Sequence, residues 1–198
     1  MMRVFFVRHG QSQHNLEKRA SGWSQVPLSD LGHEQAKSIA PFFEGIRIDK
    51  VFSSDLLRVR QTAADVLPGC NPILSDKIRE ISVGNIAGTL RTELAEKYGT
   101  VYTEAQVNRD YTPFGGENDD MVHERVCAFM KELEKVEGCE NVVVFGHEGT
   151  VHQVLNYVLK TRTDIKWLRI PNCSVSVFLF DNGRWRLEKF AYTRNLIP

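Results

Sequence analysis

Four side chains that can hold an anion stand at or near the ends of short apolar runs in this sequence. They are Arg8, His9, Arg58 and His147. In an open parallel sheet, residues that follow the strands meet at one edge, where ligands bind. A cluster of cations needs a multiply charged anion as its partner, and the planar guanidinium group matches a pair of phosphoryl oxygens. The sequence therefore predicts a phosphoryl-binding site.

The histidines of this cluster indicate which chemistry would follow. Neighbouring positive charges lower the pKa of an imidazole, so His9 stays neutral and nucleophilic near pH 7 and can attack phosphorus directly. Arg8, Arg58 and His147, the last either neutral or protonated, would hold the equatorial oxygens. These groups supply positioning and charge, and the sequence has no metal-binding motif, so we expect neither a metal nor a cofactor.

Arg58 also has a simpler interpretation. It lies in the first turn of a predicted helix, where a cation opposes the helix dipole. Considered alone, it is better explained as a solvated arginine paired with Asp55 or Asp65, because surface ion pairs are common and weak. Its coincidence with the other cationic strand ends favours the phosphoryl site.

The leaving alkoxide of a phosphoester needs a proton, so a carboxyl group with a raised pKa should lie beside the site. Glu80, which follows a predicted strand and precedes Gly84, is our choice. Asp76 and Glu117 also lie near the ends of predicted elements, and spacing alone leaves them as alternatives.

The elements that must position these residues alternate along the chain. Short apolar runs predict buried strands at Val4 to Val7 and Val142 to Phe145, and further short strands are predicted at Lys50 to Ser53 and Ile73 to Leu74. Apolar residues at helical spacing predict helices from Ser29 to before Gly45, from about Asp55 to Leu67, from Asn118 to before Gly138, and from about Val151 to Val158. The Asn182-Gly183 pair predicts a tight turn between strands at Ser174 to Phe180 and Arg184 to Phe190.

This alternation predicts a three-layer α/β/α fold with a mostly parallel central sheet and an antiparallel terminal hairpin. The length suits one domain over residues 1–198. The stretch from Gly88 to Gly116 breaks the pattern, with one weak helix near Thr92 to Tyr98 and then a polar loop that carries Tyr102, Tyr111 and Phe114. We interpret this stretch as a small lid-like insertion.

Composition restricts the partners and the compartment. Lys plus Arg equals Asp plus Glu at 25 each, so no overall charge draws the protein to nucleic acid or to an anionic membrane. The four cysteines show no metal-ligand spacing and are expected to be reduced, and no run suits a signal peptide or a membrane span. We expect a cytoplasmic protein that acts on a small phosphoester, and the sequence leaves its oligomeric state open.

The same residues stand in blocks that resemble those of the histidine phosphatase superfamily, in the branch that contains cofactor-dependent phosphoglycerate mutases and their phosphatase relatives. The resemblance covers nearly the whole chain, and the blocks are specific in combination. They are Arg8-His9-Gly10-Gln11 with Ser12 and Asn15, Ser21-Gly22-Trp23, Leu28-Ser29-Asp30-Leu31-Gly32, Ser53-Ser54-Asp55-Leu56-Leu57-Arg58, Arg79-Glu80-Ile81, Phe114-Gly115-Gly116-Glu117-Asn118, Phe145-Gly146-His147-Glu148-Gly149 and Asn172-Cys173-Ser174-Val175.

The resemblance implies a phosphoglycerate mutase-like fold and a role for each predicted site residue. His9 would be the phosphorylated nucleophile, and Arg8, Arg58 and His147 would bind the phosphoryl group. Glu80 would donate the proton, which favours it over its two alternatives. Contacts to the substrate are implied for a second set of residues, namely Gln11, Asn15, Ser21 and Gly22.

Two positions depart from the family's pattern. Glu148 stands where the family usually has glycine, and Ile86-Ala87-Gly88 replaces a common Trp-Glu-Gly. The carboxylate of Glu148 either contacts a cationic or hydroxyl part of the substrate or caps the helix that follows.

Three functions fit these residues. A mutase must shield the phosphoenzyme from water and bind a substrate carboxylate, which in the family falls to basic residues of a long insertion. Here the insertion is short, and its cations Arg91, Lys97 and Arg109 are not adjacent. We therefore predict a metal-independent phosphatase for small phosphoesters, ahead of a phosphoglycerate mutase. A non-catalytic relative that only binds phospho-ligands would be expected to have lost a site residue, and all are present.

Overall fold

The computed structural model describes residues 1–162 and 167–193 and contains a six-stranded sheet in the order β3-β2-β4-β1-β5-β6. The strands are β1 (Met2–Arg8), β2 (Lys50–Ser54), β3 (Ile73–Ser75), β4 (Asn141–Gly146), β5 (Val175–Asp181) and β6 (Arg184–Tyr192). The first four strands run parallel, β5 pairs antiparallel with β1, and β6 pairs antiparallel with β5. The predicted sheet and terminal hairpin are confirmed.

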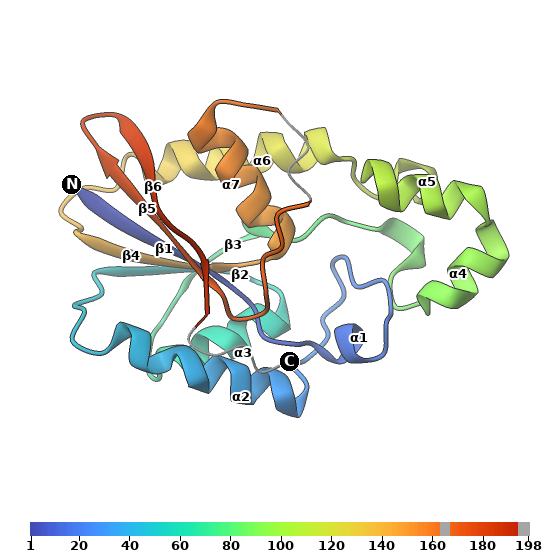
Figure 1. The fold of residues 1–198 in the computed structure, drawn as a ribbon, viewed down its shortest axis with the longest axis horizontal. Helices are drawn as coiled ribbons and strands as arrows, with labels where there is room; N and C mark the ends of the chain where they lie inside the picture. Colours follow the sequence, from blue (N-terminus) through green and yellow to red (C-terminus); the bar gives the residue numbers. More distant parts are fainter. Residues whose placement is uncertain (163–166, 194–198) are drawn as a thin grey trace.

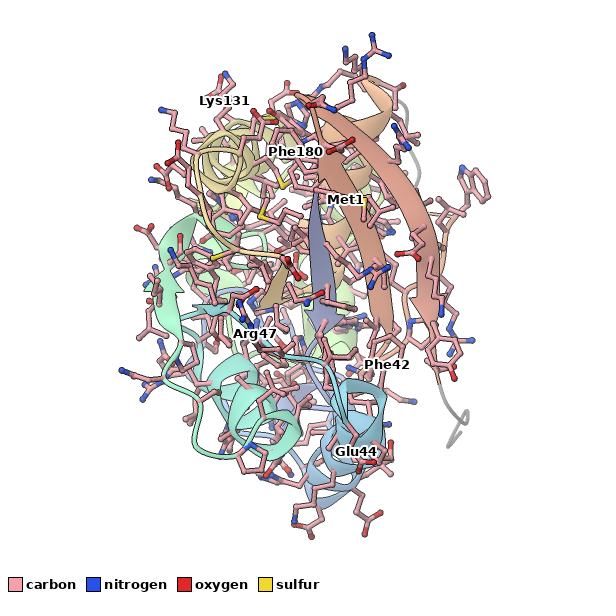
Figure 2. The ribbon with its side chains drawn as sticks, turned by 90° about the vertical axis from the view of Figure 1, so that its left-hand side faces the viewer. Met1, Phe42, Glu44, Arg47, Lys131 and Phe180 are labelled. Carbon is pink, nitrogen blue, oxygen red and sulfur yellow. The ribbon has the colours of Figure 1, made fainter. Side chains whose placement is uncertain are left out.

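Helices cover both faces of the sheet. They are α1 (Gln13–Leu16), α2 (Asp30–Ile39), α3 (Leu57–Val66), α4 (Arg91–Tyr98), α5 (Thr100–Asn108), α6 (Asp119–Leu133) and α7 (Glu148–Leu159), with 3₁₀ turns η1 (Ala40–Phe43), η2 (Asp76–Ile78), η3 (Gly84–Ile86) and η4 (Thr112–Phe114). Figure 1 shows α2 and α3 on one face and α6 and α7 on the other. In the end-on view of Figure 2, Lys131 on α6 and Glu44 beside η1 mark these two layers. The three-layer α/β/α class is confirmed.

The central strands are apolar throughout because both of their faces are covered. Successive side chains of a strand point to opposite faces. In β1, Val4 and Phe6 join the core cluster under α6 and α7, whereas Phe5 and Val7 join the cluster under α2 and α3. The strand therefore carries no alternation of polar and apolar residues, and its carboxyl end is held rigidly between two cores.

Two helix starts follow the predicted capping residues. The Ser29 side chain accepts a hydrogen bond from the backbone N–H of Gly32, and the Asn118 side chain accepts one from Met121. The end of α2 differs from the expectation, because the helix stops at Ile39 and a 3₁₀ turn carries the chain on. Pro41 lacks the N–H that a continuing α-helix requires.

The expected polar loop after Tyr98 is wrong. The segment forms α5, which follows α4 across Gly99 at a positive φ of 52°, and then η4. A third core cluster holds the segment together: Ala20, Val83, Ile86, Leu94, Tyr102, Ala105 and Phe114. Each short helix buries so few of its own residues that no helical stripe is visible in the sequence. The segment lies beyond the carboxyl ends of the parallel strands (Figure 1), and its movement as a lid stays a prediction.

The cysteines and the helices were the subject of two expectations from composition. All four cysteines are free. In the part of the chain that the structure describes, every helix is too short or too polar to cross a membrane.

Candidate active site

A cavity of about 290 Å³ opens at the carboxyl ends of the parallel strands. Most of the predicted site residues line it: Arg8, His9, Asn15, Ser21, Gly22, Arg58, Glu80 and Glu148. His147 lies directly behind the wall, in contact with Arg58. Gln11 is not among the lining residues, since its side-chain oxygen accepts a hydrogen bond from the Ser29 hydroxyl at 2.9 Å and so braces the start of α2.

His9 follows β1, and one hydrogen bond determines which of its ring nitrogens carries the proton. Its Nδ1 lies 2.6 Å from the carbonyl oxygen of Gly10, and because a carbonyl only accepts, we assign the proton to Nδ1. The lone pair is then on Nε2, which accepts a hydrogen bond from Arg58 Nε at 3.4 Å. Burial, followed by the charges of Arg58 and Arg8, lowers the pKa of His9 well below its usual value. His9 is therefore a neutral imidazole whose unprotonated nitrogen lies beside the guanidinium group of Arg58.

His147 follows β4 and caps α7, and its ring centroid lies 5.1 Å from that of His9. Its Nδ1 is 3.3 Å from Arg58 Nη2, and its Nε2 is 3.0 Å from the Ser54 hydroxyl at the end of β2. The ring is completely buried, and burial together with the charge of Arg58 lowers its pKa well below the usual value. The sequence left a neutral and a protonated His147 open, and the lowered pKa favours the neutral imidazole.

Arg58 is 1% exposed, so its interpretation as a solvated surface arginine is wrong. Its guanidinium group donates to the carbonyl oxygens of Ser24 at 3.1 Å and Gly22 at 3.0 Å. Burial lowers its pKa to about 10, which leaves it charged at neutral pH. The two carboxylates proposed as surface partners bind elsewhere, since Asp55 pairs with Arg79 and Asp65 with His33.

Arg8 reaches the cavity from the last residue of β1. It donates to the carbonyl oxygen of Ile170 and forms an ion pair with Glu148, in which Nη2 lies 3.1 Å from the carboxylate. Its Nε is buried and has no hydrogen-bond partner among the described residues. Glu148 therefore both occupies the first turn of α7 and neutralises part of the charge at the cavity wall.

Glu80 lines the same cavity as His9. Its pKa differs from the expectation. Burial raises its pKa, but the charge of Arg109 and hydrogen bonds from the backbone N–H groups of Ile81 (2.9 Å) and Gly149 (3.3 Å) outweigh burial. The net effect lowers the pKa of Glu80, so the expectation of a raised pKa is wrong. A carboxylate that accepts several hydrogen bonds is stabilised in its charged form.

The two alternatives to Glu80 do not line the cavity. Glu117 forms an ion pair with Arg125 at 2.9 Å and accepts a hydrogen bond from the backbone N–H of Ser82. Asp76 begins η2 and lines a different cavity. The backbone carbonyl of Glu80 is itself held, at 2.7 Å by the indole N–H of Trp23 and at 3.0 Å by Arg125.

Sequence reasoning missed one wall of the cavity, which the segment from α4 to η4 provides. Its lining side chains are Arg91, Tyr102, Gln106, Arg109 and Tyr111. The signal available in the sequence was the pair of arginines within the predicted lid, but the interpretation of α5 as a loop left them without a position.

Among the described residues, no group of three or more His, Cys, Asp or Glu side chains is arranged to hold a metal ion. The positive charge of the site is supplied by guanidinium groups, which suit a phosphoryl group.

The fold and the two adjacent buried histidines, His9 and His147, are features that this chain shares with one protein family. The family model of the histidine phosphatase superfamily (branch 1) matches residues 4–193, and the chain belongs to that family.

This chain matches individual relatives over most of its own length and of theirs. A broad-specificity phosphatase of Saccharomyces cerevisiae is 29% identical over 99% of this chain and 88% of its own. Phosphoglycerate mutase-like protein 4 of Arabidopsis thaliana is 29% identical over 98% of this chain and 86% of its own. The solved structure of mycobacterial glucosyl-3-phosphoglycerate phosphatase superposes with a TM-score of 0.84 at 25% identity, over 98% of this chain and 100% of its own.

Proposed function

We propose that this protein is a phosphatase that hydrolyses small phosphoesters through a phosphohistidine on His9, with Glu80 as the proton donor. One observation carries the proposal: the buried His9, whose Nε2 accepts a hydrogen bond from Arg58, lines one cavity together with Arg8, Arg58 and Glu80. The phosphatase names of the relatives from yeast and mycobacteria support hydrolysis as the reaction.

In the first step, His9 Nε2 forms a bond to phosphorus while the bond from phosphorus to the ester oxygen breaks. Arg8, Arg58 and His147 hold the equatorial oxygens, and the unpaired Nε of Arg8 is free to donate to one of them. His147 can donate from Nδ1 to the phosphoryl group if its Nε2 then accepts from the Ser54 hydroxyl, which can rotate. The proton of Glu80 passes to the leaving oxygen.

In the second step, the Glu80 carboxylate takes a proton from water, and the water oxygen attacks the phosphohistidine. The bond between phosphorus and nitrogen breaks, its electron pair returns to His9 Nε2, and inorganic phosphate leaves. Glu80 is protonated again at this point, and it releases this proton once phosphate has left, because its pKa is lowered when no anion lies beside it.

The lowered pKa of Glu80 is compatible with its role as proton donor. A phosphoester brings up to two negative charges beside the carboxylate, and like charges raise a carboxyl pKa. Binding of the substrate therefore favours uptake of the proton that the leaving group later receives.

Rapid-quench labelling tests the proposal. Brief incubation with a ³²P-labelled small phosphoester should yield an acid-labile phosphoprotein, and His9→Ala should abolish it. His33→Ala removes a histidine that pairs with Asp65 outside the cavity and serves as the matched control. Absence of label from the wild-type protein, with binding of the ester retained, would instead identify a non-catalytic binding protein.

One observation favours the mutase alternative. Arg91 and Arg109 are far apart in the sequence, yet both line the cavity, where they could hold a substrate carboxylate. A coupled assay for the interconversion of 2- and 3-phosphoglycerate, run beside a phosphate-release assay, separates the two reactions. We expect phosphate release to dominate, and interconversion without release would overturn the assignment as a phosphatase.

A further inference from the structure

Arg109 connects the segment above the cavity to the proposed proton donor. It ends α5, and its largely buried guanidinium group is anchored by Asp119, whose carboxylate lies 2.8 Å from Nε. The second oxygen of Asp119 accepts from Gln153 of α7 at 2.9 Å, so the anchor is itself fixed. At its free end, Nη2 lies 3.6 Å from Glu80 Oε1 and has no hydrogen-bond partner in the described chain.

Gly149 makes room for this pair of side chains. A Cβ atom at that position would lie 2.3 Å from Glu80 Oε1 and 2.6 Å from Arg109 Nη2. Gly149 is not among the glycines with a positive φ, so its backbone does not require glycine. The absence of a side chain there is needed for Glu80 and Arg109 to meet over the first turn of α7.

The charged and titratable surroundings of Glu80 come from several elements. They are Arg8 and His9 from β1, Arg58 from α3, Arg109 from the end of α5, Tyr111 before η4, Arg125 from α6, and His147, Glu148 and the N–H of Gly149 at the start of α7. Arg109 is the cation in this set that forms an ion pair with the Glu80 carboxylate.

We propose that Arg109 is a positioning residue that holds the Glu80 carboxylate against the first turn of α7 and sets the pH at which Glu80 can protonate the leaving group. The inference rests on the proposed role of Glu80. An opposite charge at this distance favours the ionised carboxyl, so Arg109 keeps Glu80 from taking up a proton until the substrate arrives.

Two esters separate this effect from general damage. Ethyl phosphate has a leaving group that needs a proton, whereas p-nitrophenyl phosphate has one that departs without it. The ratio of their single-turnover rates of phosphoryl transfer to His9, plotted against pH, isolates the protonation of Glu80, because changes at His9 affect both esters and hydrolysis of the common phosphohistidine does not enter. In the wild type, this ratio should fall as the pH rises through the pKa of Glu80 in the complex.

Loss of Arg109 removes the stabilising cation, so the pKa of Glu80 rises and the falling limb of the ratio moves to higher pH. We expect Arg109→Gln to move it by about one pH unit, which is about a tenfold change in the ratio on that limb. Arg109→Lys should restore most of the wild-type profile. Lys97→Gln, which removes a cation from α4 outside the cavity lining, should leave the profile unchanged.

Gly149→Ala provides an independent route if Arg109→Gln does not fold. Its Cβ must displace the Glu80 carboxylate and the Arg109 guanidinium group from their present positions, while alanine itself favours the helix, and the limb should move in the same direction. An unmoved limb in the folded variants refutes the role of Arg109. Failure of the proposed function has a different signature, since Glu80→Gln would then leave ethyl phosphate hydrolysis intact.

Discussion

Burial of the two site histidines links their chemistry to the stability of the fold. His9 is 5% exposed and His147 is completely buried, and both have pKa values well below the usual one. The environment that lowers the pKa of His9 therefore disfavours its protonated form in the folded protein. In the unfolded chain, each histidine regains a pKa near 6.5.

The free energy of unfolding should fall as the pH is lowered below about 6.5. In that range the unfolded chain binds protons at these histidines and the folded protein does not, so stability decreases by about 1.4 kcal/mol per pH unit for each histidine until the folded-state pKa is reached. The half-buried His14, whose pKa is also lowered, adds to the same trend. Urea unfolding at intervals between pH 7.5 and 5 measures the slope.

His147→Gln is the control for this prediction, because it removes one of the titrating groups and should reduce the slope. Buried carboxylates do not interfere, since Glu80 has a lowered pKa and releases its stabilisation only at more acid pH. A wild-type stability that stays constant from pH 7.5 to 5 would contradict the assignment of neutral buried histidines.

At the scale of elements, the loop that carries His9 is packed tightly on the start of α2. A Cβ on Gly32 would lie 2.0 Å from the carbonyl oxygen of Gln11, and one on Gly10 would lie 2.4 Å from that of Gly32. Both contacts are with backbone atoms, which cannot turn away as a side chain does. The position of His9 therefore depends on the absence of side chains at two glycines far apart in sequence.

Gly32→Ala should destabilise the protein and reduce its activity together. Alanine gains up to about 1 kcal/mol of helix propensity, but forcing the backbone of the catalytic loop away from α2 costs about 1–3 kcal/mol, as overpacking generally does. Chemical denaturation and phosphate release should both show the loss. Ser38→Ala, on the exposed side of the same helix, should show neither, and full activity in Gly32→Ala would mean that this contact does not position His9.

Particular elements explain what the sequence could predict. The strands β1 and β4 were recognisable because each is a short apolar run followed within two residues by a site residue, and Ser29 and Asn118 marked helix starts through local hydrogen bonds. The fold class and the grouping of Arg8, His9, Arg58 and His147 followed from these local signals, whereas Glu80 was preferred to Asp76 and Glu117 only through the family resemblance. The helix α5 was missed because its stability comes from residues distant in sequence, such as Ala20 and Val83. The contact of Arg109 with Glu80 was invisible for the same reason.

At the scale of the whole molecule, a chain with no net charge concentrates cations in one cavity. Lys plus Arg equals Asp plus Glu, yet Arg8, Arg58, Arg91 and Arg109 line the same space with two carboxylates. The repulsion among these groups is relieved when an anion enters, so a bound anion should stabilise the native state.

Inorganic phosphate should therefore raise the melting temperature of the protein beyond any effect of ionic strength. At a phosphate concentration about 100-fold above its dissociation constant, the stabilisation is about 2.7 kcal/mol. Thermal unfolding in phosphate, compared with sodium chloride at equal ionic strength, measures it. Arg8→Gln should show a smaller shift, and equal effects of the two salts would argue against an anion site.

The separate small core of the segment from α4 to η4 has a consequence for engineering the enzyme. Because that core draws little on the two main ones, exchange of residues 91–114 for the matching stretch of a relative should leave the sheet and its histidines in place. Such a graft would replace, in a single operation, the cavity wall that the segment from α4 to η4 provides, including Arg109. Selectivity and acid–base behaviour would then be inherited together from the donor.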